Sequence, residues 1–562
     1  MRIEEGFQQV PLNEGNPYLH DPVLPSLLRR LIPSKFFTEI EPELERFGAD
    51  VITTIRAQGT LISPPKLIQY DNWGQRVDEL QTSEGWRNLK AIAQREGIPG
   101  IFYERTYREY SRLFGFSKVF MMSGDSHEVF CPLSMTDGAA RVTELMGTDA
   151  MKTDVFTRLI SRDPSSALVS GQWMTERSGG SDVSQTETNA RPLDTSDQLG
   201  SKYSLDGFKW FSSATDGDIA LALARTGPVD SGSRGLSLFL VPLRSPLLYD
   251  RSNPIPSSTS NGIYIHRLKN KIGTHALPTA ELSLEKATAY LVGPLNQGVK
   301  NIVPVLNITR SVGGLRKCLA IATSIEGGKR LLRDVPLHVA QLSSINVVYR
   351  ALTHLTFGVV AILGRVECGV ASAEEHDRLR MFTPIVKAFA MAALGGQGYM
   401  EENDIGRLIR DGLVERIWEG TTTVLSIDLF TLKQFVSWCN SIILSCPSDL
   451  LKRVQEAIQL LQWRIDSLVA AFLHPIPPLI ARPALMFMGY IASSIYLLEH
   501  ATWSHIRGED GFATDAEVFR RWVYDGGFGA VERELDRTRS ESKLADASNS
   551  EIAFGRGVHA KL

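Results

Sequence analysis

The chain has 562 residues, of which 43% are hydrophobic and 22% charged, and its formal net charge is −3. This composition predicts a globular protein with several domains and large apolar cores. The small net charge excludes a chain-wide attraction to nucleic acid or to an anionic membrane. The five cysteines include no Cys-x-x-Cys pair, which argues against a structural zinc and a disulfide framework, and we expect no metal site.

Secondary-structure signals divide the chain into four blocks, which together predict an α+β multidomain fold. Helical periodicity in the first block gives way to β-rich runs at 219–224 and 236–242, separated by turn residues at 226–235. Helical patterns then return, and we expect helices over 336–363 and 384–394. The predicted domains are an N-terminal helical domain (1–170), a central β-barrel-like domain (171–290), a helical bundle (291–430) and an additional C-terminal helical domain (431–562).

The β block opens with a glycine-rich segment, Gln172-Trp-Met-Thr-Glu-Arg-Ser-Gly-Gly-Ser-Asp-Val183. The hydroxyls of Thr175 and Ser181, together with backbone N–H groups, are suited to bind a flat ring edge that presents carbonyl oxygens and ring nitrogens. An aromatic segment at 206–213 follows and is expected to pack beside the same ring. The alternative is that these glycines only form the turns of a β domain. No Gly-x-Gly-x-x-Gly follows a strand here, so a Rossmann dinucleotide site is not supported.

The most informative segment is 394–421, which combines a glycine cluster with one carboxylate. Gly395 and Gly396 allow backbone to approach a bulky ligand closely. Glu419 lies between Trp418 and Gly420, and a carboxylate beside an indole is a stronger base where water is scarce. This pattern fits proton abstraction next to a carbonyl group. The alternative is a solvated glutamate after a glycine that ends a helix.

Two features of the last block bear on location. The apolar stretch 479–498 is interrupted by Arg482 and Pro483, which favours a packed helix over a membrane span. The final residues, Ala560-Lys561-Leu562, are similar to the Ser-Lys-Leu peroxisomal signal. We expect peroxisomal import if the source is eukaryotic and a cytoplasmic protein otherwise.

Several short motifs follow one another along the chain. They are Gln9-Val-Pro-Leu-Asn-Glu-Gly-Asn-Pro-Tyr18, Cys131-Pro-Leu-Ser-Met-Thr136, Met174-Thr-Glu176, Gly180-Ser-Asp-Val183, Gly207-Phe-Lys-Trp-Phe-Ser-Ser213, Leu306-Asn-Ile-Thr-Arg310, Gly395-Gly-Gln-Gly-Tyr399, Arg407-Leu-Ile-Arg-Asp411 and Ile417-Trp-Glu-Gly-Thr421. Taken in order, these motifs resemble the acyl-CoA dehydrogenase superfamily, and the opening segment is similar to the start of its AidB-like branch.

The resemblance implies a non-covalent FAD between the β domain and the helical bundle. It assigns Glu419 as the catalytic base and places Arg310 near a phosphate or the substrate. The chain departs from the family pattern at 330–334, where Arg-Leu-Leu-Arg-Asp replaces Arg-x-x-Phe-Gly, and at Ala392, where a glutamine is usual. The implied FAD contacts are Met174, Thr175, Ser181, Phe211, Ser213, Gly395, Gly396, Thr421 and Thr423.

Three functions are compatible with these residues. The first is FAD-dependent oxidation of the α,β C–C bond of an acyl thioester by a homodimer or homotetramer. The second is a flavin oxidase or monooxygenase of specialised metabolism with the same fold. The third is a DNA-associated alkylation-response flavoprotein, which requires a basic C-terminal surface. Residues 431–562 contain 14 Lys and Arg against 15 Asp and Glu, so the charge pattern argues against nucleic-acid binding and favours subunit packing or coverage of the active-site mouth.

Overall fold

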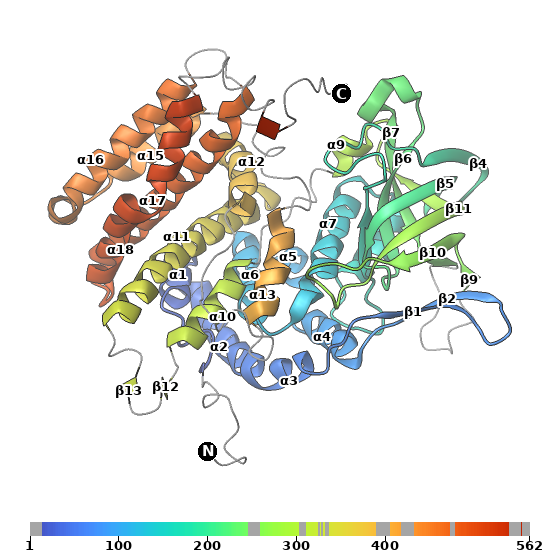
Figure 1. Ribbon diagram of the computed structural model, residues 1–562, viewed down its shortest axis with the longest axis horizontal. Coiled ribbons are helices and arrows are strands. Elements are labelled where there is room, and N and C mark those ends of the chain that lie inside the picture. The colour runs from blue at the N-terminus through green and yellow to red at the C-terminus, as the bar shows by residue number, and fades with distance from the viewer. Residues whose placement is uncertain are drawn as a thin grey trace.

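The computed structural model describes residues 14–245, 259–302, 311–323, 326–327, 330–331, 336–388, 405–416, 432–472, 478–538 and 552–553. A helical part lies on one side of the molecule and a strand-rich part on the other, with α7 (Phe130–Met146) next to the strands (Figure 1). This order of helical, β and helical regions confirms the predicted α+β fold class. The predicted C-terminal signal at 560–562 lies outside the described residues.

The N-terminal region is mainly helical, as predicted. Asp21 Oδ1 accepts hydrogen bonds from the N–H groups of Val23 and Leu24, both at 2.8 Å, and so satisfies donors at the start of the first helix. Ser83 caps the helix that begins at Glu84 by accepting from Trp86 N at 3.4 Å. The helices are α1 (Leu24–Leu31), α2 (Ser34–Asp50), α3 (Arg56–Gly59), α4 (Glu84–Arg95), α5 (Gly100–Glu104), α6 (Ser111–Met122), α7 (Phe130–Met146) and α8 (Thr157–Leu159), with π-helical segments at Val51–Ile55 and Met151–Phe156.

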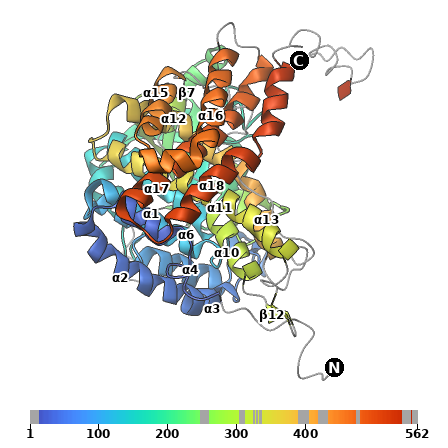
Figure 2. The ribbon, with the colours of Figure 1, turned by 90° about the vertical axis from the view of Figure 1, so that its left-hand side faces the viewer.

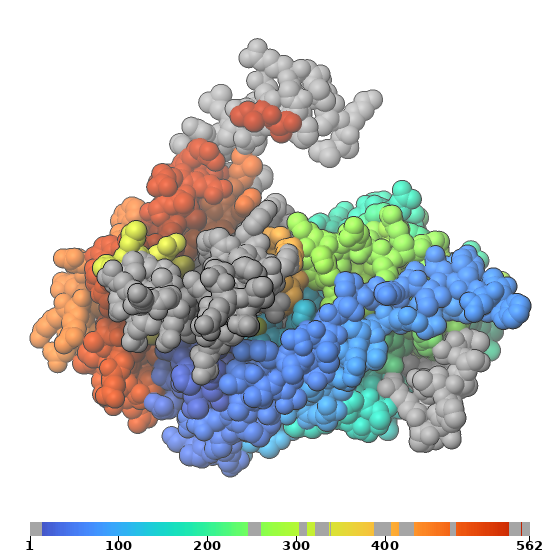
Figure 3. Space-filling view, turned by 60° about the horizontal axis from the view of Figure 1, so that its bottom comes forward, coloured from blue at the N-terminus to red at the C-terminus, as the bar shows by residue number. Residues whose placement is uncertain are grey.

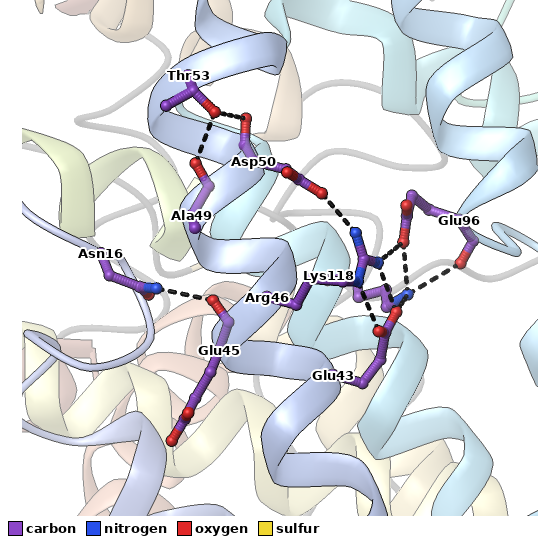
Figure 4. Close-up of polar contacts among 9 residues, drawn as sticks. All are labelled: Asn16, Glu43, Glu45, Arg46, Ala49, Asp50, Thr53, Glu96 and Lys118. Atoms are coloured by element: carbon purple, nitrogen blue, oxygen red, sulfur yellow. Dashed lines mark hydrogen bonds and ion pairs between the residues drawn. The ribbon is translucent and has the colours of Figure 1, made fainter.

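A buried lysine joins α2 and α6 (Figure 4). Lys118 Nζ lies 2.7 Å from Glu43 Oε1 and 2.7 Å from Glu96 Oε2. Arg46 binds the same two carboxylates, each at 2.6 Å. The hydrogen bonds of Arg46 are the largest cause that holds the pKa of Glu43 at about 2, against burial, with Lys118 adding to the lowering. The cluster therefore fixes the contact between the two helices with charges that are all paired.

A β-hairpin at 66–81 was not predicted from the sequence. It consists of β1 (Lys66–Tyr70) and β2 (Arg76–Gln81), paired antiparallel. The hairpin lies along the β region, as the blue segment beside the green one in Figure 3 shows. Gln69 Nε2 donates to the carbonyl of Ile265 at 2.8 Å, and Ile265 N donates to Asp78 Oδ2 at 2.9 Å. These long-range bonds explain why this part of a helical block forms strands.

The central β region forms a closed path of strands. Within the described residues, β11 pairs with β5, β5 with β4, β4 with β6, β6 with β7, and β7 again with β11. Every residue of β6 and β7 is buried, as their continuous apolar runs predict. The barrel-like character is therefore confirmed. The strands are β3 (Ser170–Trp173), β4 (Asn189–Asp197), β5 (Gly200–Ser213), β6 (Ile219–Arg225), β7 (Leu236–Pro242), β10 (Ile263–Leu268) and β11 (Thr279–Val292), with a separate pair β8 (Arg244–Ser245) and β9 (Thr259–Ser260).

The remaining described chain is mostly helical. The long helix α11 (Pro336–Glu367) packs against two C-terminal helices, α17 (Ala481–Arg507) and α18 (Phe512–Asp525) (Figure 2). The contact is close at Gly358, where an added Cβ would lie 2.4 Å from Tyr496 Cε1. The elements are α9 (Gly298–Ile302), α10 (Ser311–Thr323), β12 (Glu326–Gly327), β13 (Arg330–Leu331), α11 (Pro336–Glu367), α12 (Ala373–Ala388), α13 (Ile405–Gly412), α15 (Leu432–Leu444), α16 (Ser448–Ala471), α17 (Ala481–Arg507) and α18 (Phe512–Asp525).

Two of the helix predictions can be compared with these bounds. The helix expected over 336–363 is α11, which ends slightly later. The prediction that a helix starts at Pro384 is wrong, because α12 begins at Ala373 and contains Pro384 in its interior. The apolar side chains of Phe382 and Ile385 on either side are fully buried, so packing outweighs the local cost of a proline.

Two helices, α11 and α17, are long and apolar enough to cross a membrane by length and composition. The most apolar window of each is 78% buried inside the protein. Such burial is typical of the core helices of a packed domain, so it weighs against membrane spans. The packed helix predicted over 479–498 is confirmed as part of α17.

Candidate active site

The segment after β3 contacts the end of β5, and this brings together two of the predicted motifs. The carbonyl of Thr175 accepts a hydrogen bond from Trp210 N at 3.0 Å. Gly180 lies against the Thr175 side chain, since an added Cβ would lie 3.1 Å from Thr175 Oγ1. Met174 and Thr175 are partly buried, whereas Ser181 is exposed on the following loop. Of these three predicted contacts, Thr175 is therefore held beside β5, and Met174 packs against a neighbouring hydrophobic cluster.

A buried ion pair between Lys209 and Glu176 fixes the Thr175 segment against β5. Lys209 Nζ lies 2.6 Å from Glu176 Oε1 and donates to the Leu223 carbonyl at 2.8 Å. Glu176 also accepts from Thr188 Oγ1 at 2.5 Å and from Glu187 N at 2.6 Å. Burial raises the pKa of Glu176, but the charge of Lys209 and these hydrogen bonds outweigh it, so the pKa stays below its ordinary value. The pair thus anchors the Thr175 segment to the barrel as a charged unit.

The predicted aromatic residue, Phe211, and the predicted hydroxyl, Ser213, lie at the C-terminal end of β5. We call this end the open end of β5, because the Phe211 ring is exposed there. Phe211 is 40% exposed, which is unusual for a phenylalanine within a β-strand of a packed domain. Ser213 is partly buried at the end of the same strand. Nearby on β3, the buried Gln172 Oε1 has no hydrogen-bond partner among the described residues. An exposed ring, a hydroxyl and an unpaired side-chain oxygen fit a flat polar ring such as an isoalloxazine.

The loop between β10 and β11 contributes a lysine that the sequence did not single out. Lys271 Nζ donates to Thr279 Oγ1 and to the Leu277 carbonyl, both at 2.9 Å. Thr279 Oγ1 lies 3.0 Å from Ser213 Oγ. Burial lowers the pKa of Lys271 to about 8. No local pattern singles out Lys271, because only the pairing of β5 with β11 connects it, through Thr279, to Ser213.

Helix α13 holds this loop in place. Thr274 N donates to Asp411 Oδ1 at 2.6 Å, and Arg407 Nη1 lies 3.2 Å from Asp411 Oδ2. Arg407 also donates to the Gly124 carbonyl at 3.0 Å. Gly273 lies so close to α13 that an added Cβ would lie 2.3 Å from the carbonyl oxygen of residue 410. The motif at 407–411 therefore joins the helical region to the barrel beside the candidate site.

Six of the predicted site residues lie outside the described residues, and their roles stay predictions. They include the predicted base and all contacts from the late glycine cluster. They are Arg310, Gly395, Gly396, Glu419, Thr421 and Thr423.

Comparison with family models gives three matches along the chain. Residues 8–164 match the adaptive response protein AidB N-terminal domain. Residues 171–287 match the middle domain of acyl-CoA dehydrogenase, and residues 382–429 match its C-terminal domain. The matches follow the chain order of helical, β and helical regions.

Among curated proteins, acyl-CoA dehydrogenase family member 11 of Caenorhabditis elegans is 38% identical over 456 residues, which cover 75% of this chain and 72% of that protein. The putative acyl-CoA dehydrogenase AidB of Escherichia coli is 27% identical, with 75% and 79% covered.

Among solved structures, Caenorhabditis elegans ACDH-11 in complex with C11-CoA is 33% identical, with a TM-score of 0.85 over 99% of both chains. An acyl-CoA dehydrogenase of Bacillus anthracis complexed with FAD shares the fold, with 15% identity, a TM-score of 0.66 and coverage of 98% of this chain and 96% of that one.

Proposed function

Since the chain belongs to the acyl-CoA dehydrogenase family, we propose that it oxidises the α,β C–C bond of an acyl-CoA thioester, with Glu419 as the catalytic base. It is an FAD-dependent oxidoreductase, as its family implies. The observation that carries the proposal is the similarity to an acyl-CoA complex along nearly the whole chain. The open end of β5, with Phe211 and Ser213, supports it because these residues fit the flavin ring.

The reaction requires two hydrogens to leave neighbouring carbons of the acyl chain. The Glu419 carboxylate takes the α-proton, which becomes acidic when hydrogen bonds polarise the thioester carbonyl. FAD held at this site would supply the hydride acceptor for the β-hydrogen, so that both C–H bonds break and a C=C bond forms. Met174 and Thr175 would hold one side of the flavin ring, and Ser213 would offer a hydroxyl to it. Exclusion of water from the site raises the basicity of Glu419.

The test is an anaerobic titration of the FAD-loaded protein with straight-chain acyl-CoAs of increasing length. We expect one class of chain length to bleach the flavin absorbance of the wild type. Glu419→Gln should keep the yellow flavin and bleach it about 10²–10⁴-fold more slowly, which is the contribution that general-base catalysis makes. Glu415→Gln is the matched control, four residues away. Bleaching by Glu419→Gln at the wild-type rate would contradict the role of Glu419.

The electron acceptor separates the dehydrogenase from the oxidase alternative. A dehydrogenase passes electrons to a protein acceptor, and its reduced flavin reacts slowly with oxygen. We expect little oxygen uptake during acyl-CoA turnover. Stoichiometric peroxide formation with the same acyl-CoA would favour an oxidase of the same fold.

We further propose that the chain assembles as a homodimer or homotetramer, as its family resemblance implies. Light scattering behind a sizing column measures the mass directly against the 62.2 kDa chain. A monomer at all protein concentrations that retain FAD would contradict this assembly.

A further inference from the structure

Lys271, Thr279 and Ser213 form a hydrogen-bonded chain that ends at the candidate flavin face. Its two links are Lys271 Nζ to Thr279 Oγ1 at 2.9 Å and Thr279 Oγ1 to Ser213 Oγ at 3.0 Å. Thr279 and Ser213 are directly opposite each other in the pairing of β11 with β5. The strand register therefore sets the second link, and the loop that carries Lys271 sets the first.

The charge of Lys271 gives this chain a direction. An ammonium group only donates hydrogen bonds, so Thr279 Oγ1 accepts from it. Either hydroxyl can donate in the bond between Thr279 and Ser213. We assign Thr279 as the donor, because accepting from an ammonium polarises its O–H and makes it the stronger donor of the two. Ser213 receives that bond and keeps its own hydrogen for a different acceptor, and no other partner of Ser213 Oγ is found among the described residues. The hydroxyl of Ser213 is thus prepared to donate.

We propose that Lys271 is a positioning residue that acts through Thr279 to make the Ser213 hydroxyl a hydrogen-bond donor to the flavin. The inference rests on the proposed function, because it requires FAD at the open end of β5. A donor backed by a cation favours a negatively charged ring. Lys271 therefore raises the tendency of the bound flavin to accept electrons.

The surroundings of Lys271, which is partly buried, set it apart from the buried lysines. Lys118, Lys209 and Lys317 each lie 2.6–2.7 Å from a carboxylate oxygen. Among the described residues, no carboxylate lies within ion-pair distance of Lys271 Nζ, whose printed partners are Thr279 and the Leu277 carbonyl. A partly buried ammonium without a carboxylate partner is suited to a negative charge that a ligand brings.

The groups that face Lys271 come from several elements. Cys131 of α7, Glu128 just before α7, and Asp411 of α13 each raise the pKa of Lys271, while burial lowers it more strongly. On its own loop, His275 Nε2 lies 2.6 Å from the Lys271 carbonyl. Asp411 is engaged by Thr274 N and Arg407, so it holds the loop and is not directed at the ammonium. The net result is a lysine that changes charge at mildly alkaline pH.

The experiment measures the midpoint potential and visible spectrum of bound FAD across pH 6–9.5. For Lys271→Met we expect a potential about 30 mV lower at pH 7, which corresponds to a tenfold weaker preference for two-electron reduction. The wild type should show an additional fall in potential as pH rises through about 8, and Lys271→Met should not. Lys271→Arg should restore most of the wild-type potential, because an arginine also donates and stays charged.

Two further variants separate the relay from a merely structural role. Thr279→Val keeps the cation but removes the link, and we expect it to lower the potential as Lys271→Met does. In the Ser213→Ala background, Lys271→Met should have no further effect on the potential. Arg267→Met is the matched control on the neighbouring strand β10, since its side chain is 67% exposed, and it should leave spectrum and potential unchanged.

The outcomes distinguish this inference from the proposed function. A wild type that acyl-CoA bleaches, with Lys271→Met and Thr279→Val both unchanged in potential and pH profile, overturns the relay alone. A wild type that cannot be loaded with FAD overturns the proposed function and the relay together. If Lys271→Met fails to fold, Thr279→Val with its near-identical shape decides by the same readout.

Discussion

Lys118 of the helical region and Lys209 of the barrel are both buried but are held in different ways. Lys118 has two carboxylate partners, Glu43 and Glu96, which are 34% and 20% exposed and are shared with Arg46 (Figure 4). Lys209 has one carboxylate partner, Glu176, which is only 4% exposed. The helical cluster can therefore lose one member and still balance its charges. The barrel pair cannot, because either residue alone is an uncompensated buried charge.

The largest effect is expected from Lys209→Met. This change leaves the Glu176 carboxylate buried without its cation, and breaking such a pair costs about 3–5 kcal/mol. Urea unfolding followed by circular dichroism measures the loss. We also expect weaker FAD binding, because Glu176 adjoins Thr175. A loss below about 1 kcal/mol would show that the barrel pair is as replaceable as the helical one.

A smaller effect is expected from Lys118→Met, at about 1.5 kcal/mol, as for the loss of a hydrogen bond to a charged group. Arg46 still pairs with both carboxylates, and solvent reaches them. The same urea experiment measures it, with FAD binding as the second readout. FAD binding should be unchanged, since the cluster lies between helices. A loss as large as that of Lys209→Met would remove the distinction between the two clusters.

The pH dependence of the helical cluster sharpens the comparison further. The pKa of Glu43 is about 2, held there by Arg46 against burial and with help from Lys118. Its folded pKa lies below the unfolded value of about 4.3, so the stabilisation is complete above that value and is lost as pH falls toward 2.

After allowance for solvent screening, we expect about 1 kcal/mol from Glu43 at neutral pH. The stability difference between wild type and Glu43→Gln, measured by urea unfolding, should shrink over pH 5 to 2. A difference that stays constant across this range would contradict the assignment to Glu43.

The smallest effect is expected from Glu517→Gln on α18. Glu517 pairs with Arg520 and Arg521, but all three side chains are 40–45% exposed. Exposed pairs contribute little, so we expect less than about 0.5 kcal/mol, removed by 1 M salt. A larger decrease of the urea midpoint that persists in 1 M salt would contradict this prediction. It would show that solvent exposure does not explain the different stabilities that the Glu517, Lys118 and Lys209 clusters contribute.

The sequence predicted the parts of the fold that follow from local pattern. The continuous apolar runs of β6 and β7 indicated strands buried on both faces, and the structure confirms them. The hairpin at 66–81 was missed although its turn, Asp71-Asn-Trp-Gly74, is a recognisable signal. Its strands are stabilised by Ile265, far along the chain, which no local window contains.

In the candidate site too, residues that belong to a local motif could be identified from the sequence, whereas residues linked only by strand pairing could not. Motifs identified Met174, Thr175 and Ser213, and the structure places Thr175 against β5 through Trp210 N. Lys271 and Thr279 were not identified, because their link to Ser213 depends on the register between β5 and β11, across 66 residues of sequence. Arguments from spacing along one segment do not reveal such a contact.

The β1–β2 hairpin also constrains how the chain is made. The hairpin leaves the ribosome early, but the hydrogen bond from Ile265 N to Asp78 cannot form until Ile265, 187 residues later, has been synthesised. At about 5–20 residues per second, this partner arrives about 10–40 s afterwards. During that interval the hairpin presents a free strand edge and Trp73, which is 89% exposed even in the finished fold. Nascent chains of this protein therefore offer a strand-pairing surface to chaperones, or to each other on a crowded polysome, until the barrel is synthesised.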